Sequence, residues 1–269
     1  MYRTFETFPE IGYTGVVEGH GDTGEARTHA LGSRQQRRVG DMARNGCLRT
    51  VGGIGIAGAI GAIAFQYLFR PWAAQWGTTL QEVYATYPGD ELIPAPKGKS
   101  THAITIHAPA AAIWPWLVQL GQGRGGFYSY DCLENLFGLN IHSANEVAPE
   151  LQDLKVGDIV RMHAEGGAQA VILNPERDLV MYADPDTQAG RPATMSGTPG
   201  SGPLDFVSTW ALYLRPIDAN NTRLIARSRG DWNPNLQAGL MWGVVLDPVA
   251  FIMSRKMLHG IKERAERAG

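Results

Sequence analysis

The side chains best suited to proton transfer lie between residues 128 and 143. His142 is the strongest candidate for a general acid or base, because an imidazole titrates near neutral pH. Asp131 and Tyr128 precede it and offer a carboxyl group and a phenol as partners. No Ser-His-Asp order and no metal-ligand spacing can be assembled around His142, and a loop histidine more often makes structural hydrogen bonds. We therefore expect no metal site, and catalysis by these three residues is the second choice.

Residues 129–137 are predicted to form a short helix that carries several polar groups. Asp131 and Asn135 lie one turn apart on one face of this helix, as do Tyr130 and Glu134. A paired-acid site is conceivable, but Asp and Ser at the start of a helix commonly cap it. Structural capping is the preferred interpretation.

Three arginines are candidates for binding an anionic part of a ligand. Arg124 lies in the glycine-rich segment 121–126, which follows a predicted helix and lacks the spacing of phosphate-binding loops. Glycines that end a helix explain the segment, and Arg124 remains a candidate anion anchor because a guanidinium group binds carboxylate or phosphate in a forked geometry. Arg227 and Arg229 share one face of a predicted strand with Asp231, so a salt-bridged ladder is favoured over a role in lining a pocket.

The composition excludes several classes of protein. The chain has 269 residues, 44% of them hydrophobic, and its 24 Lys plus Arg oppose 26 Asp plus Glu. A net charge of −2 lacks the dense basic field that nucleic-acid binding needs. Two cysteines make neither a disulfide scaffold nor a Cys-rich zinc site. The length suits one sizeable domain with an appendage, and no cofactor is expected.

The first 69 residues are predicted to contain a tail and a membrane helix. Residues 1–50 have no sustained apolar period and end in an arginine-rich stretch, so we expect a disordered basic tail. Residues 51–69 carry no charge. At 1.5 Å per residue they reach about 28 Å, close to the thickness of a bilayer's hydrocarbon core. The positive-inside rule places the N-terminus in the cytoplasm and the C-terminal domain outside. Small residues in this helix could support a homodimer.

Two other interpretations of residues 51–69 remain open. A signal peptide that starts at Met42 and is cleaved near Ala64 would make the protein an exported one. A buried soluble helix is the other, although five glycines would weaken such a helix in water. The apolar run continues past Ala64 to an aromatic and basic anchor at Arg70 and Trp72, so an uncleaved membrane anchor is preferred.

Residues 70–99 are predicted to be a connector, and residues 100–269 a folded domain. A strand at 102–107 and helices at 111–120 and 129–137 come first. Turn signals then separate five short strands, which predicts an antiparallel meander: 159–163, 168–173, 179–183, 207–216 and 222–229. The chain closes with a helix over 236–265. Its first half is apolar enough to be mistaken for a second membrane span, but Asp247 and Pro248 interrupt it, and packing against the sheet is expected.

Residues 102–158 resemble membrane-anchored bacterial proteins of the SRPBCC superfamily, also described as START-like or polyketide cyclase-like. The resemblance is carried by the stretch WPWLVQLGQGRGGFYSYDCLENLFGLNIHSANEVAPELQDLKVGD. RPWAAQWG, PGDELIP, the strand with Trp210 and the closing FIMSRKMLHGIKERAE extend it to about residues 70–269. Cys132 is a departure, because related sequences tend to carry Trp there. This difference would open or reshape a pocket wall, and a reactive thiol is not expected.

The resemblance implies an α+β helix-grip fold, in which a curved antiparallel sheet wraps around a long C-terminal helix. It also implies a cavity between sheet and helix that holds an apolar or amphipathic small molecule, and ligand pockets usually have this form. Ser208 and Trp210 share one face of their strand and Val207 and Thr209 the other, and the sequence leaves open which face points inward. The candidate ligand-binding residues are Arg124, Tyr128, Tyr130, Asp131, Glu134, His142, Trp210, Arg227 and Arg229.

Three functions follow from this interpretation. We favour a membrane-tethered binding protein for a lipid-, quinone- or polyketide-like molecule. An enzyme of the cyclase or dehydratase type, using His142 with Asp131 or Tyr128, is the alternative. A protein-interaction module whose cavity is filled by its own side chains is the third.

Overall fold

The computed structural model describes residues 61, 63–136 and 138–268. The predicted basic tail and most of the predicted membrane helix, residues 51–60 and 62, lie outside the described residues. The compact unit that contains the sheet extends over Ile63–Gly269, so the predicted connector belongs to the same unit as the domain that follows it.

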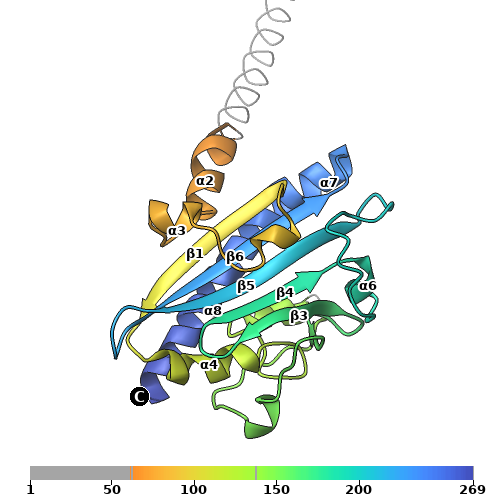
Figure 1. Ribbon diagram of the computed structural model, residues 1–269. Coiled ribbons are helices and arrows are strands. Elements are labelled where there is room, and N and C mark those ends of the chain that lie inside the picture. Colours follow the sequence, from red (N-terminus) through yellow and green to blue (C-terminus); the bar gives the residue numbers. More distant parts are fainter. Residues whose placement is uncertain (1–60, 62, 137, 269) are drawn as a thin grey trace, which may run out of the picture. The chain divides into compact units, whose positions relative to one another are not determined.

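One curved antiparallel sheet of six strands forms the framework, in the order β1-β6-β5-β4-β3-β2 (Figure 1). Strands β2 to β5 each pair with the next strand along the chain, which confirms the predicted meander. Strand β1 completes the sheet by pairing with β6, from Gly98 opposite Gly230 to Ile106 opposite Thr222. The strands are β1 (Gly98–Ile106), β2 (Ile159–Arg161), β3 (Gly167–Asn174), β4 (Asp178–Ala183), β5 (Phe206–Pro216) and β6 (Thr222–Trp232).

The helices precede and interrupt the strands, and the longest one closes the chain, so the predicted α+β class is confirmed. Thr79 caps α3 with a capping box to Glu82, and Pro109 occupies the N-cap position of α4. The helices are η1 (Phe65–Phe69), α2 (Arg70–Ala73), α3 (Leu80–Tyr84), η2 (Asp90–Leu92), α4 (Ala110–Val118), α5 (Asp131–Leu136), η3 (Pro149–Leu151), α6 (Pro185–Gln188), α7 (Leu236–Leu240), η4 (Met241–Leu246) and α8 (Asp247–Ala268).

The closing helix is continuous through Asp247 and Pro248, where its pattern changes from the π-helical η4 to the α-helical α8. A proline lacks the N–H group that an α-helical bond would use, and π-helical turns accommodate such a gap. Among the described residues, one helical stretch, Gln237–Arg267, is long and apolar enough to cross a membrane by length and composition. The second half of α8 packs against the sheet as expected, because Met257, Leu258 and Ile261 are buried in the main core.

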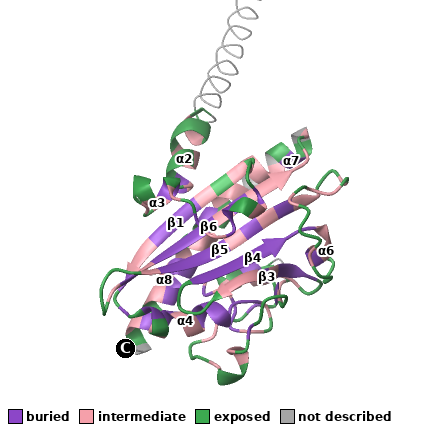
Figure 2. Cartoon of the chain, in the orientation of Figure 1, coloured by how far each residue is buried: buried purple, intermediate pink, exposed green. Residues whose placement is uncertain are grey.

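The two faces of the sheet are both covered, by different elements. Helices α4 and α8 cover the face that carries Trp210, Leu212 and Leu214, so this is the inner face. The connector covers the opposite face, where the ring of Tyr87 stacks on that of Tyr213 at a centroid distance of 4.6 Å. Figure 2 shows the resulting band of buried residues along the central strands.

Candidate ligand cavity

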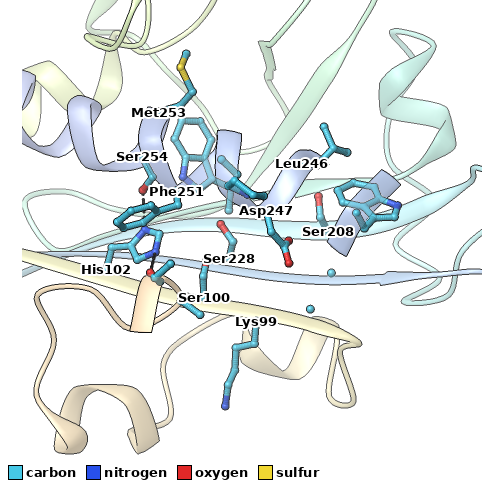
Figure 3. Close-up of a pocket in the computed structure, with 18 of the residues that line it drawn as sticks. Lys99, Ser100, His102, Ser208, Ser228, Leu246, Asp247, Phe251, Met253 and Ser254 are labelled. Carbon is cyan, nitrogen blue, oxygen red and sulfur yellow. Dashed lines mark hydrogen bonds between the residues drawn. The ribbon is translucent and has the colours of Figure 1, made fainter. Parts of the chain in front are cut away.

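A cavity of about 680 Å³ lies between the inner face of β1, β6 and β5 and the start of α8 (Figure 3). The segments η1 and α2 border it on one side, and η4 borders it on another. Its volume falls within the range of about 300–1,000 Å³ that small-molecule sites occupy. The aromatic part of its wall consists of Phe69, Phe127, Trp210, Trp232, Trp242 and Phe251.

Contacts between aromatic rings hold this wall in place. Trp242 of η4 stacks on Trp232 of β6 at 5.3 Å and meets Phe206 of β5 edge-on at 5.1 Å. Phe251 of α8 meets Phe69 at 6.1 Å and Trp72 at 5.4 Å, both edge-on. Such pairs add roughly 0.5–1.5 kcal/mol each beyond the burial of their area. The Phe251 contacts join η1 and α2 to α8, which is far from them in the sequence, and the Trp242 contacts join η4 to β5 and β6.

A strip of hydroxyl groups crosses the floor of the cavity. Ser100, Ser228 and Ser208 come from the three neighbouring strands β1, β6 and β5, and their side chains point toward α8 (Figure 3). Each hydroxyl can both donate and accept a hydrogen bond. The floor can thus recognise oxygen or nitrogen atoms of a mainly apolar ligand.

His102 is the ionisable group at the centre of this floor. It is 4% exposed, with Nε2 2.9 Å from the Ala73 carbonyl oxygen and Nδ1 2.8 Å from Ser254 Oγ. Because a carbonyl oxygen only accepts, Nε2 carries the proton, and Nδ1 accepts a hydrogen bond from the Ser254 hydroxyl. Burial lowers the pKa of His102 to about 4, although the bond to Ala73 acts in the opposite direction. His102 is therefore neutral at physiological pH.

The pair His102 and Ser254 has the contact that a nucleophile makes with its general base. A pKa of about 4, however, makes this imidazole a weak proton acceptor at neutral pH, where a general base works best with a pKa near 7. The geometry instead suits a fixed acceptor that orients the Ser254 hydroxyl at the cavity wall. Sequence reasoning missed His102, although its position on the same strand face as Ile104 and Ile106 was a usable signal.

Glu134 is a second ionisable group at the cavity. It is 5% exposed, and its Oε1 accepts a hydrogen bond from Ser129 Oγ. Its Oε2 is buried with no hydrogen-bond partner among the described residues. Burial raises the pKa of Glu134, the Ser129 hydroxyl lowers it, and the nearby Asp131 raises it further, with a net increase. This carboxyl group can donate a hydrogen bond to a ligand when it is protonated.

The three residues predicted for catalysis do not border this cavity. Asp131 accepts hydrogen bonds from the backbone N–H and the hydroxyl of Ser143, at 2.8 and 2.6 Å. Tyr128 is buried, donates to the Trp116 carbonyl oxygen at 3.1 Å, and has a pKa raised to about 12 by burial. His142 is exposed, with Nε2 3.3 Å from Asn140 Oδ1. Asp131 and Tyr128 fasten the segment around α5.

The predicted ligand-binding residues divide into two groups. Trp210 and Glu134 border the cavity, whereas Tyr130 is exposed and does not. Cys132, which was expected to open or reshape a pocket wall, is exposed and does not border the cavity. Arg124 donates to the carbonyl oxygens of Val118 and Leu151, and it does not border the cavity either.

Arg227 and Arg229 bind other protein groups on the face of the sheet opposite the cavity. Arg229 belongs to the cavity border, but strand alternation directs its side chain to the opposite face, where it donates to the Ile93 carbonyl oxygen. The guanidinium group of Arg227 lies on that same face and binds Asp90. Asp231 pairs instead with Lys97, so the three side chains do not form the expected ladder.

No family model matches the chain, and no curated protein matches it. Solved structures similar to it include a hypothetical protein from Helicobacter pylori, with 10% identity, a TM-score of 0.42, and coverage of 70% of this chain and 98% of that one. A protein from Mesorhizobium loti has 12% identity and a TM-score of 0.38, over 64% of this chain and 99% of that one. A protein from Mycobacterium smegmatis has 13% identity and a TM-score of 0.38, over 64% and 92%. At these levels none of them assigns a function.

Proposed function

We propose that this chain is a membrane-anchored, SRPBCC-like binding protein with a helix-grip domain, and that it holds a hydrophobic or amphipathic small molecule in the cavity. Residues 51–69 are the proposed tether. The observation that carries the proposal is the open volume of about 680 Å³ between sheet and C-terminal helix, with an aromatic wall and a floor of hydroxyl groups. This volume argues against the alternative of a cavity filled by the protein's own side chains.

The charged groups at the cavity indicate a ligand whose polar part is neutral. Arg70 is bound to Asp247 and Lys97 is bound to Asp231, so both cations are already paired. Lys99 points away from the cavity (Figure 3). Since a bound anion would need a cation that is free to pair with it, hydroxyl, carbonyl or quinone oxygens fit better than a carboxylate or phosphate. A quinone- or polyketide-like molecule therefore suits the site better than a free fatty acid.

The first test is native mass spectrometry of the full-length protein extracted in detergent, followed by organic extraction and identification of what co-purifies. A stoichiometric neutral apolar molecule is the expected result. The second test is titration with decylubiquinone, a neutral probe whose ring quenches tryptophan fluorescence. Because Trp210, Trp232 and Trp242 border the cavity, saturable quenching is expected.

A variant that fills the cavity provides the specific control. Ser228→Phe places a ring in the open volume and is expected to weaken quenching at least ten-fold, whereas Ser201→Phe, in an exposed loop, is expected to leave it unchanged. Circular dichroism establishes that both variants are folded. The proposal would be overturned if the native mass spectrum shows only the ligand-free protein and decylubiquinone does not quench the wild type saturably.

A further inference from the structure

Large apolar side chains are exposed on two segments that are far apart in the sequence. On η1, α2 and the residue leading into them, Ile63, Tyr67, Leu68 and Trp72 are 58%, 72%, 71% and 55% exposed. At the start of α8, Val249 and Ile252 are 46% and 47% exposed. Figure 2 shows exposed residues, in green, on α2. Exposed apolar residues scattered singly are ordinary, but a contiguous group marks a surface that another apolar phase covers.

The two segments form one surface because they contact each other. The ring of Phe251 lies between Val249 and Ile252 in the sequence of α8, and it meets Trp72 at 5.4 Å. Arg70 Nε donates to Asp247 Oδ2 at 3.0 Å beside this contact. We call the surface made by residues 63–72 and 249–252 the apolar end.

The apolar end stops at the same level on both segments. The next exposed side chain after Trp72 is that of Gln75, and the next after Ile252 is that of Arg255. Exposed apolar side chains recur further along the chain, at Leu80 and Tyr84 of α3. The Arg255 guanidinium lies over the ring of Trp76, 5.2 Å from its centroid, and so joins the two segments at this boundary. Aromatic and basic side chains gather in this way where a protein passes from hydrocarbon to water.

The cavity is bordered by the same segments. Phe69, Arg70, Asp247 and Ala250 all line it, so its rim is part of the apolar end. Residues 63–69 of this surface are also the last residues of the predicted membrane helix, 51–69. A tether of this kind holds the apolar end at the bilayer surface, and the lipid bilayer is the partner that this continuity favours over a second copy of the chain.

We infer that the apolar end inserts into the lipid bilayer and that the cavity opens there, so that the ligand passes between membrane and protein without crossing water. This inference rests on the proposed function, and it adds the route and the source of the ligand. The paired charges of Arg70 and Asp247 are compatible with such a position, because an ion pair is far less costly than a lone charge near hydrocarbon.

The closing helix lies at the interface and does not span the bilayer. Met257, Leu258 and Ile261 are buried against the sheet, which keeps the second half of Gln237–Arg267 in the domain. The residues before Arg255, 237–254, would extend about 27 Å at 1.5 Å per residue, and Asp247 lies among them, where a charge disfavours a position at the centre of the bilayer.

The depth of the apolar end is measured with a fluorescent label in the full chain. Cys47 and Cys132 are replaced by Ser, and one cysteine at Ile252 is labelled with an environment-sensitive nitrobenzoxadiazole dye in phosphatidylcholine vesicles. Blue-shifted emission and at least two-fold quenching by lipids with a nitroxide on the acyl chain are expected. The same label at Val156 or Ile217, both exposed apolar residues outside the apolar end, is expected to behave as in water. A water-like signal at Ile252, or a signal that requires high protein density in the vesicles, would overturn the inference.

The route is tested with charged variants. Val249→Asp combined with Ile252→Asp is expected to slow transfer of decylubiquinone from vesicles to the protein at least ten-fold, while binding in detergent stays within two-fold of the wild type. Ile217→Asp is the control and is expected to change neither. Unaltered transfer in the double variant would contradict the route. If the wild type fails to bind the probe in detergent, the proposed function fails, whereas the label at Ile252 still decides whether the apolar end enters the bilayer.

Discussion

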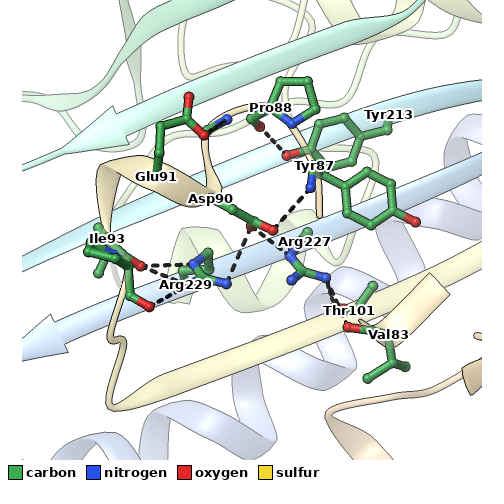
Figure 4. A network of polar contacts seen from close by, with 12 residues as sticks. Val83, Tyr87, Pro88, Asp90, Glu91, Ile93, Thr101, Tyr213, Arg227 and Arg229 are labelled. Carbon is green, nitrogen blue, oxygen red and sulfur yellow. Dashed lines mark hydrogen bonds and ion pairs between the residues drawn. The ribbon is translucent and has the colours of Figure 1, made fainter. Parts of the chain in front are cut away.

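Asp90 and Arg227 form a buried ion pair that joins the connector to the sheet, with Arg227 Nε 2.9 Å from Asp90 Oδ1 (Figure 4). The side chains are 11% and 4% exposed. Arg229 Nη1 approaches the same oxygen at 3.4 Å, and the other carboxylate oxygen accepts the backbone N–H of Tyr87. One carboxylate therefore balances two buried guanidinium groups and fixes the turn before η2.

Asp90→Asn is expected to destabilise the protein by about 3–5 kcal/mol, because it leaves two buried cations without their counter-charge. The measurement is urea unfolding of the full-length protein in detergent, with tryptophan fluorescence as the readout. Asp153→Asn removes the partner of Lys155 in an exposed ion pair and is the matched control, with little or no expected loss of stability. A loss of less than about 1 kcal/mol in the Asp90 variant would show that the arginines are satisfied by carbonyl groups alone.

His102 is expected to make stability depend on acid. Its pKa is about 4 in the folded protein and 6.5 in the unfolded chain, so between these values the unfolded chain binds the additional proton. The free energy of unfolding should then fall by about 1.4 kcal/mol for each pH unit from 6.5 down to 4. Above pH 6.5 both states are neutral at this residue, and it contributes no pH dependence.

Replacement by a neutral residue isolates this effect. His102→Asn should flatten the slope of the free energy of unfolding between pH 4 and 6.5, whatever it does to absolute stability. His142→Asn, at the exposed loop histidine, should leave the slope as it is in the wild type. Equal slopes in the wild type and the His102 variant would mean that the imidazole becomes protonated without unfolding.

The strands and most helices could be predicted because their signals are local. Alternation of apolar and polar residues, proline before α4 and the turn residues between strands all lie within a few positions of the element they define. The inner face of β5 could not be predicted for the opposite reason. Ala211 and Tyr213 on one face are as buried as Leu212 and Leu214 on the other, because the connector covers the outer face. The sequence of β5 alone does not show that the connector packs on its outer face.

The candidate site was harder to predict because the cavity is not local. The sequence candidates for proton transfer, His142 and Asp131, lie close together in the chain, whereas the cavity draws on residues from Gln66 to Met257. Trp210 and Glu134 are the predicted ligand-binding residues whose side chains border the cavity. His102 was overlooked because residues 102–107 were predicted only as a strand, and its partners Ala73 and Ser254 lie far from it in the sequence.

Gly260 provides a test of how closely α8 packs on the segment before α5. A Cβ atom at Gly260 would clash with the Tyr128 carbonyl oxygen, which is backbone and cannot move aside. Gly260→Ala gains about 1 kcal/mol of helix propensity, but overpacking of this kind costs about 1–3 kcal/mol, so we expect a lower melting temperature. Gly239→Ala in α7 meets no atom within 4 Å and is expected to raise it slightly. A higher melting temperature in the Gly260 variant would mean that α8 can move away from the backbone of Tyr128 without loss of stability.

Glu134 offers a final test at the cavity wall itself. Burial raises its pKa above 4.5, so the folded protein keeps a proton over a pH range in which the unfolded chain has released it. The contribution of this carboxyl group to stability is then present below pH 4.5 and is lost as the pH rises through the pKa of the folded protein.

Glu134→Gln keeps an oxygen that can accept a hydrogen bond from the Ser129 hydroxyl, and it removes the buried charge. Its melting temperature should therefore exceed that of the wild type by more at neutral pH than in acid below pH 4.5, while Glu165→Gln, at an exposed position, should show no such difference. A Glu134→Gln variant that melts lower than the wild type at neutral pH would indicate that the carboxylate form is the one the cavity stabilises, and that a ligand would meet an anion there.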